Sequence, residues 1–196
     1  MRLNIIRHGM TEANERHLYC GFTDIPLSKL GRQSLTRLKE TIIYPTADLY
    51  ITSGLIRASE TLSILYDREP DVVMEEFKEF NFGDFEMKSY DELKDKAEYQ
   101  HWINDGSVRC PNGESRDIFE NRVMAGLNKL SVMIEAKLQS DTWHESAVVV
   151  CHGGVIALIM ERLFPDQKNF HDWQPDFGRG YTLNISSERN PELLLL

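Results

Sequence analysis

The sequence lacks the features that would place it at once among disulfide-stabilised or zinc-binding proteins. It contains only three cysteines, Cys20, Cys110 and Cys151, which is an odd number with no Cys-x-x-Cys pair. Neither a disulfide framework nor a zinc knuckle is therefore expected, and this cysteine usage fits a protein of the reducing cytoplasm.

Long apolar runs and an excess of positive charge are also missing. No stretch reaches the length that a helix needs to cross a bilayer, and the apolar run within residues 1–6 is too short for a secretory signal. The final Leu193–Leu196 is too short for an anchor, so we expect a frayed tail or a patch that covers the core. The net charge of −9 argues against broad binding to nucleic acids or membrane surfaces. A pocket for an anionic ligand must then be local and formed by a few basic side chains.

What the sequence does contain is an alternation of strand-like and helix-like segments in a chain of 196 residues, which suits one domain over residues 1–196. Apolar runs predict strands, and apolar residues at three- and four-residue spacing predict helices. The expected strands are Arg2–Arg7, Asp48–Thr52, Val72–Met74 and Ala147–Cys151, with an edge antiparallel strand over Tyr181–Ser186. The expected helices run through Leu30–Ile42, Leu55–Leu65, Phe119–Ile134 and Ile156–Leu163. This order predicts an α/β protein, a three-layer α/β/α fold with a mostly parallel, mixed central sheet.

A short polar segment at about residues 86–112 interrupts this alternation. Ser89 to Glu92 has the pattern of a capping box, which predicts a small helix. The apolar points that follow are few, chiefly Tyr99, Trp102 and Ile103. We interpret the segment as a small helical insertion, or lid, that lies over the site.

Basic and imidazole side chains follow three of the expected strands. Arg7, His8 and Gly9 come after the first strand, Arg57 lies in the first turn of the helix after the second, and His152 follows the late strand. Carboxyl ends of parallel strands share one edge of a sheet, where ligands of α/β proteins bind. Two arginines and two histidines can therefore converge there, and converging cations predict a phosphate ligand.

A metal site is the rival interpretation of two histidines with carboxylates nearby. The flanking guanidinium groups would repel a divalent cation, so we expect neither a metal nor another cofactor.

Three motifs together resemble a known family. They are Arg-His-Gly-x-Thr-x-x-Asn over Arg7–Asn14, Ser-x-Leu-x-Arg-Ala-x-x-Thr over Ser53–Thr61, and His-Gly-Gly over His152–Gly154. The order of these motifs is similar to that of the histidine phosphatase superfamily, which includes phosphoglycerate mutases and related small phosphatases. The resemblance runs from residue 1 to about residue 165 and implies a phosphoglycerate mutase-like fold.

The resemblance also implies roles for individual residues. His8 would attack the phosphorus of a phosphomonoester as a neutral imidazole and form a phosphohistidine. Arg7, Arg57 and His152 would hold the phosphoryl oxygens. Glu79 would protonate the leaving alcohol and later activate water.

Other positions are expected around the ligand with less defined roles. Glu114 is the alternative proton donor, although its carboxylate could equally stabilise the start of the long helix. Met87 stands where many members of the family have glycine, so Glu86 and Met87 are expected to shape the pocket wall. The remaining expected ligand-binding residues are Gly9, Thr11, Asn14, Cys20, Gly21 and Gly153.

Hydrolysis is the expected reaction, because the chain has no Arg-Arg pair of the kind that phosphoglycerate mutases carry in a longer insertion. The run Gly83–Met87 with Trp102 downstream is similar to α-ribazole phosphatases of cobalamin assembly. Activity on other small phosphates, an activity like that of phosphoglycerate mutase or fructose-2,6-bisphosphatase, and a non-catalytic phospholigand-binding module remain open. The expected partner is a small-molecule phosphomonoester, with no nucleic acid and no membrane, and a homodimer is left open.

Overall fold

The computed structural model describes residues 2–137, 146–184 and 192–195, and it contains the expected alternation of strands and helices. In chain order the elements are β1 (Arg2–Arg7), α1 (Glu12–Glu15), α2 (Lys29–Thr41), β2 (Leu49–Thr52), α3 (Ile56–Tyr66), β3 (Val72–Val73), the 3₁₀ helices η1 (Glu75–Phe77) and η2 (Gly83–Phe85), α4 (Tyr90–Leu93), α5 (Ala97–Asn104), α6 (Arg116–Lys137), β4 (Ser146–Cys151), α7 (Gly153–Leu163), η3 (Phe170–Trp173), β5 (Gly180–Asn184) and β6 (Glu192–Leu195).

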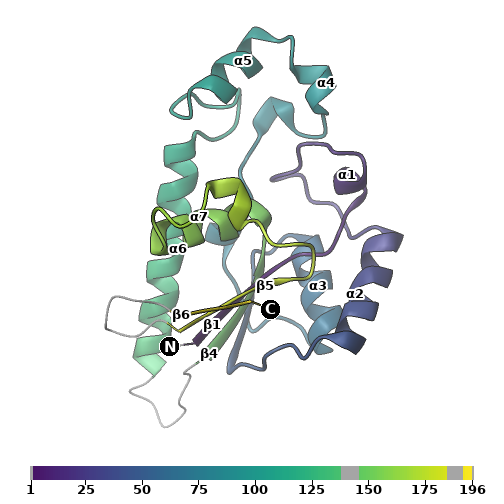
Figure 1. Cartoon of the computed structure of the whole chain (residues 1–196), viewed down its shortest axis with the longest axis vertical. Helices are drawn as coiled ribbons and strands as arrows, with labels where there is room; N and C mark the ends of the chain where they lie inside the picture. Colours follow the sequence, from purple (N-terminus) through teal and green to yellow (C-terminus); the bar gives the residue numbers. More distant parts are fainter. Residues whose placement is uncertain (1, 138–145, 185–191, 196) are drawn as a thin grey trace.

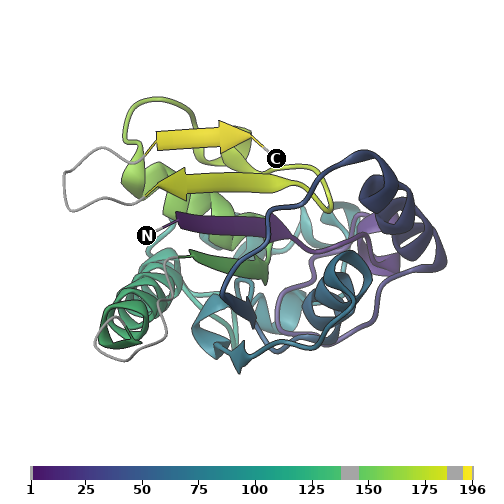
Figure 2. The same cartoon turned by 90° about the horizontal axis from the view of Figure 1, so that it is seen from below.

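The strands form one mixed sheet in the order β3-β2-β4-β1-β5-β6. The strands β3, β2, β4 and β1 are parallel to one another, and β5 runs antiparallel to β1 and β6 (Figure 2). In the β1–β4 register Arg7 is opposite Cys151, so both strands end at the same level. The residues that follow, His8 and His152, are therefore brought to one edge of the sheet.

Alternating side chains of the strands point to two separate cores. Ile5 and Val149 belong to the core beneath α6 and α7, whereas Ile6 and Val150 belong to the core beneath α2 and α3. Figure 1 shows these helix pairs on opposite sides of the sheet. The structure thus confirms the three-layer α/β/α fold.

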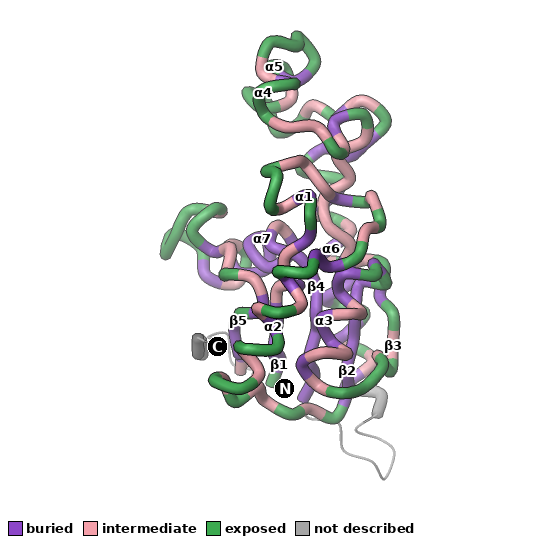
Figure 3. The backbone as a smooth tube through the Cα atoms, turned by 90° about the vertical axis from the view of Figure 1, so that its right-hand side faces the viewer, coloured by how far each residue is buried: buried purple, intermediate pink, exposed green. Residues whose placement is uncertain are grey.

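The segment that begins with η2 has a small core of its own, at the end of the molecule toward which β1 runs (Figure 1). Its buried residues are Phe85, Leu93, Tyr99 and Cys110. The expected capping box is present, because Ser89 Oγ accepts from the backbone of Glu92 and the Glu92 carboxylate accepts from the backbone of Ser89. Most of α4 and α5 is exposed, in contrast to the central strands (Figure 3). A role of this segment as a lid stays a prediction.

At the C-terminal part of the chain, the expected edge position of the strand over Tyr181–Ser186 and the expected frayed tail were wrong. Strand β5 is not at the edge of the sheet, because β6 pairs with it on the side opposite β1. Leu193–Leu195 form part of β6 rather than a frayed tail, while residues 185, 186 and 196 lie outside the described ones. That these leucines cover the core stays a prediction. Strand pairing depends on backbone hydrogen bonds between distant segments, and neither an alternating pattern nor a short leucine run reveals the partner. Within the described chain, no helix combines the length and apolarity that crossing a membrane requires.

Candidate active site

His8 lies directly after β1 and is held in one orientation. Its backbone N–H donates to the Cys151 carbonyl at 2.9 Å, and its ring Nδ1 lies 2.6 Å from the Gly9 carbonyl oxygen. A carbonyl oxygen can only accept, so Nδ1 carries the ring proton and Nε2 keeps its lone pair. Nε2 is the nitrogen that a nucleophilic attack requires.

The surroundings of His8 keep the ring neutral. Its side chain is only 5% exposed. Burial lowers the pKa of His8 well below the ordinary value, and the guanidinium groups of Arg57 and Arg7 lower it further, against the opposing effect of the Gly9 carbonyl. The imidazole of His8 is therefore neutral at neutral pH, which is the form that can act as a nucleophile.

His152 faces His8 across the end of the sheet. The two ring centroids are 5.0 Å apart, and His152 is fully buried. Its Nε2 lies 2.8 Å from the hydroxyl of Ser53, whereas Nδ1 has no hydrogen-bond partner among the described residues. When Ser53 donates to Nε2, the ring proton is on Nδ1, where it can be donated to a phosphoryl oxygen.

Arg7 leaves part of its guanidinium group unsatisfied. One terminal nitrogen donates to the Pro175 carbonyl at 2.8 Å, and the group stacks on Phe177 at 4.1 Å from the ring centre. Its Nε is buried without a partner in the described chain. Burial lowers the pKa of Arg7, and the carboxylates of Glu79 and Asp176 oppose that shift. An N–H donor of a cation is thus available to an anionic ligand.

Arg57, in the first turn of α3, is the most deeply buried cation of the site at 1% exposure. It donates to the carbonyl oxygens of Thr23 and Gly21, at 2.9 and 2.6 Å. No carboxylate pairs with it within the described residues, so its full positive charge acts on His8 and His152. Burial and this charge lower the pKa of His152 well below its ordinary value.

Glu79 lies between η1 and η2 and reaches the start of α7. Its two carboxylate oxygens accept from the backbone N–H groups of Phe80 and Gly154, at 2.8 and 2.9 Å. Gly154 follows His152 by two residues, so the Glu79 carboxylate lies at the start of the helix that His152 precedes. A Cβ atom on Gly154 would lie 2.4 Å from Glu79 Oε1, which explains the glycine at this position.

Glu114, the alternative proton donor, is held in a different way. Its carboxylate forms a bidentate ion pair with Arg122, with both N–O distances at 2.8 Å, and also accepts from the Asn81 backbone at 2.9 Å. Both carboxylate oxygens of Glu114 are therefore occupied by Arg122, and one of them also by the Asn81 backbone.

Comparison with known proteins identifies the family. The model of the histidine phosphatase superfamily (branch 1) matches residues 3–194. The chain belongs to the histidine phosphatase superfamily. An Escherichia coli protein named adenosylcobalamin/α-ribazole phosphatase is 34% identical to it, over 96% of this chain and 92% of that protein. A Salmonella typhimurium protein of the same name is 30% identical, over 83% of this chain and 79% of that protein.

Solved structures agree with this family. The crystal structure of the α-ribazole phosphatase from Shigella flexneri has a TM-score of 0.83 at 28% identity, over 100% of this chain and 96% of that one. A phosphoglycerate mutase from Thermus thermophilus has a TM-score of 0.72 at 25% identity, over 100% of this chain and 98% of that one. The fold of this histidine phosphatase is therefore phosphoglycerate mutase-like, as expected.

The other expected ligand-binding residues of this histidine phosphatase lie around the same edge of the sheet. Thr11 and Asn14 hydrogen-bond to each other as a capping box of α1, which occupies part of their polar surface. Gly9 N–H donates to Thr61, and a Cβ atom on Gly153 would lie 3.1 Å from Arg7 Nε. Their contacts with a ligand stay predictions.

Cys20 and Gly21 are parts of the loop that holds Arg57. The Cys20 thiol is half-buried, and burial raises its pKa while the charge of Arg57 opposes that shift. It is therefore a thiol rather than a nucleophilic thiolate at neutral pH. Gly21 has no room for a side chain, since a Cβ atom there would lie 1.7 Å from the Phe80 carbonyl oxygen.

Several residues that shape the site of this histidine phosphatase were missed by the sequence reasoning. Ser53 and Thr61 lie inside the Ser53–Thr61 motif, and their polar side chains at its two ends were an available signal. Phe177 packs against His8 and Arg7 from a segment without any motif. Arg122 reaches the loop of Glu79 from the second turn of α6, where one more charged residue in a helix gives no signal.

Proposed function

We propose that this histidine phosphatase hydrolyses a small phosphomonoester through a phosphohistidine intermediate on His8. The observation that carries the proposal is the hydrogen bond between His8 Nδ1 and the Gly9 carbonyl. It leaves Nε2 unprotonated beside His152 and two guanidinium groups, which are the surroundings that attack on a phosphate dianion requires.

The residues suggest a two-step reaction. His8 Nε2 forms a bond to phosphorus while the bond to the leaving oxygen breaks, and Glu79 in its acid form gives that oxygen a proton. Arg7, Arg57 and His152 offset the charge on the phosphoryl oxygens. The Glu79 carboxylate then takes a proton from water, which attacks phosphorus and releases inorganic phosphate and neutral His8.

α-Ribazole 5′-phosphate is the substrate that we propose. Its support comes from the names of the Escherichia coli and Salmonella relatives, and from aromatic rings near the Glu79 loop. Tyr19, Phe82 and Trp102 contact one another, with ring centroids 5.0 to 6.0 Å apart. Such rings can stack on a flat leaving group.

We also propose that the enzyme works in the cytoplasm, where its three free cysteines would stay reduced. Whether it forms a homodimer stays a prediction that sedimentation would test.

A substrate panel with labelled phosphate tests the proposal. We expect the highest kcat/KM for α-ribazole 5′-phosphate, and acid-labile, base-stable label on the wild-type protein. His8→Ala should lose activity by a factor on the order of 10⁴ or more while still binding vanadate, and exposed His101→Ala is the matched control. Phosphoryl transfer from 3-phosphoglycerate to a second sugar would instead indicate a mutase. Turnover retained in His8→Ala would contradict the nucleophile, and absence of turnover in the wild type would indicate a binding module.

A further inference from the structure

We propose that Arg122 and Glu114 are positioning residues that hold Glu79 at the reacting oxygen. This inference rests on the proposed function, because it takes Glu79 as the proton donor. Neither side chain needs to touch the substrate for this role.

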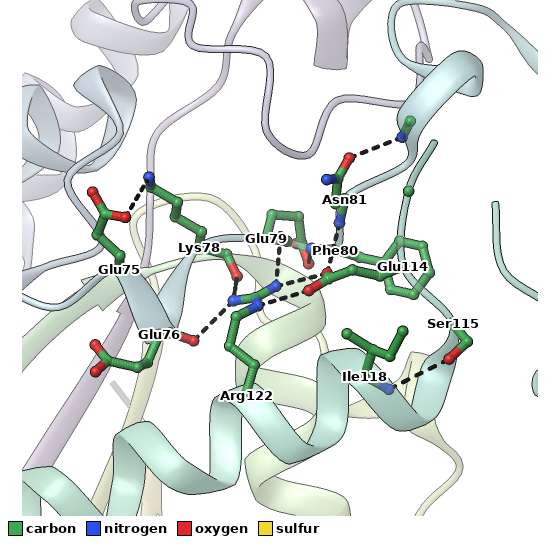
Figure 4. Close-up of polar contacts among 12 residues, drawn as sticks. Glu75, Glu76, Lys78, Glu79, Phe80, Asn81, Glu114, Ser115, Ile118 and Arg122 are labelled. Carbon is green, nitrogen blue, oxygen red and sulfur yellow. Dashed lines mark hydrogen bonds and ion pairs between the residues drawn. The ribbon is translucent and has the colours of Figure 1, made fainter. Parts of the chain in front are cut away.

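Arg122 uses all five of its N–H groups on the neighbourhood of Glu79. Two bind the Glu114 carboxylate. The other three donate to backbone carbonyl oxygens at 2.8 to 3.1 Å, those of Glu76, Lys78 and Glu79 (Figure 4). Since a guanidinium group has five donors in a fixed plane, one side chain of α6 fixes three peptide groups at once.

Glu114 binds the same loop on the C-terminal side of Glu79. Its carboxylate accepts from Asn81 N–H, and its own backbone N–H donates to the Asn81 carbonyl, both at 2.9 Å. The chain is therefore fixed at residues 76, 78 and 79 by Arg122 and at residue 81 by Glu114. We call this pair, with its contacts to residues 76–81, the Arg122–Glu114 clamp.

The clamp matters because Glu79 has little other support. It lies outside the helices and strands, in the connection between η1 and η2. Among the residues that the structure describes, only two backbone N–H groups hold its carboxylate. The side chains of Arg122 and Glu114 are 19% and 9% exposed. An ion pair this far removed from water keeps a defined geometry, and breaking it leaves an uncompensated charge.

The competing explanation is that the clamp only stabilises the fold. Substrates with different leaving groups distinguish this explanation from a positioning role. A poor leaving group such as an alkoxide needs a proton from Glu79, whereas p-nitrophenolate departs without one. The value of kcat/KM depends only on the steps up to the first irreversible one, which is phosphoryl transfer to His8. Hydrolysis of the phosphohistidine therefore does not affect it. Loss of positioning should therefore be selective for alkyl phosphates.

The variant Arg122→Lys keeps the charge and removes the planar fork. We expect kcat/KM for glycerol 1-phosphate to fall about 10- to 100-fold, the effect of displacing a catalytic group by about 1 Å, and kcat/KM for p-nitrophenyl phosphate to fall less than about threefold. Glu79→Gln should show the same selectivity. The double variant Arg122→Lys with Glu79→Gln should have the same kcat/KM for glycerol 1-phosphate as Glu79→Gln alone, because the two changes act on one group.

Two further variants serve as a second test and as a control. Glu114→Gln keeps the shape of the side chain and should give the same selectivity to a smaller degree, which decides the matter if Arg122→Lys does not fold. Arg116→Lys is the matched control, because Arg116 lies on the same helix and pairs with Glu161 at 2.5 Å. It should change kcat/KM for neither substrate, and all folded variants should keep the vanadate affinity of the wild type.

The outcomes separate this inference from the proposed function. Suppose that Glu79→Gln lowers kcat/KM selectively for glycerol 1-phosphate. If the clamp variants then lower kcat/KM equally for both substrates, or if their loss adds fully to that of Glu79→Gln, the clamp only supports the fold. If Glu79→Gln itself is not selective, the assignment of the proton donor fails and the clamp inference fails with it. The label on His8 would still report the phosphohistidine in both cases.

Discussion

The imidazole rings of His8 and His152 lie 5.0 Å apart, and both have pKa values held well below the ordinary one by burial and by Arg57. The folded protein therefore keeps both rings neutral at pH values at which the unfolded chain takes up protons. This difference has a consequence for stability as well as for catalysis.

We expect the free energy of unfolding to decrease as the pH falls below about 6.5, the unfolded pKa of histidine. Because the folded pKa values are the lower ones, the unfolded state binds more protons in this window, and stability is complete only above it. Each ring contributes a slope of up to about 1.4 kcal/mol per pH unit, or about 2.7 for both. Urea unfolding between pH 5.5 and 7.5 measures this slope. His8→Asn should lower this slope by up to about 1.4 kcal/mol per pH unit. An unchanged slope in His8→Asn would contradict the neutral ring.

Ser53→Ala removes the hydroxyl that lies 2.8 Å from His152 Nε2. The orientation and tautomer of the ring depend on that contact, so we expect kcat to fall on the order of tenfold and stability by about 1 kcal/mol. Phosphate release and urea unfolding measure the two effects. Ser59→Ala on α3 is the control, since Ser59 contacts Thr52 rather than His152. Full activity in Ser53→Ala would show that the ring is held by packing alone.

Glu86 supports Arg57 through the loop that both contact. Its carboxylate accepts from four backbone N–H groups, those of Gly21, Phe22, Thr23 and Phe82. Arg57 donates to two carbonyl oxygens of the same loop, those of Gly21 and Thr23. One side chain thus binds the amides and the other the carbonyls of a single short segment.

We expect Glu86→Ala to lower stability by about 3 kcal/mol and phosphate affinity by about tenfold, because hydrogen bonds to a charged acceptor are lost and the loop that holds Arg57 loosens. Calorimetric binding of phosphate measures the affinity. Added formate should restore part of it by binding the freed amides. Exposed Glu98→Ala is the control. Phosphate affinity that stays at the wild-type level in Glu86→Ala would show that Arg57 is held independently of this loop.

Met87 has a φ of 59°, in the left-handed region that favours glycine. Glycine adopts this backbone conformation without strain, which fits the glycine that the family resemblance implies at this position. Met87 is 37% exposed, so little packing is lost on truncation. We expect Met87→Gly to raise the free energy of unfolding by about 1 kcal/mol, while Met87→Ala, which keeps the Cβ atom, should not. Urea unfolding compares the three proteins, and equal stability of the Gly and Ala variants would argue against strain at this position.

Local patterns were sufficient for much of the fold and for the centre of the site. The strand before Arg7 and His8 and the β-branched run before His152 are readable because each is a buried strand followed by polar residues, and parallel pairing brings their ends together. The position of β5 within the sheet was misread because its partner β6 is a leucine run that carries no sign of pairing.

By itself, the sequence determined the order of strands and helices, the family, and the identity of the residues at the strand ends, since these depend on periodicity and on short motifs. Only the tertiary structure showed how Glu79 and Glu114 differ, because both are carboxylates in polar segments and their partners lie elsewhere in the chain. Gly154 N–H at the start of α7 binds the first, and Arg122 the second. Such partners come from positions 8 and 75 residues away in the chain, and that spatial contact leaves no pattern in a local stretch of sequence.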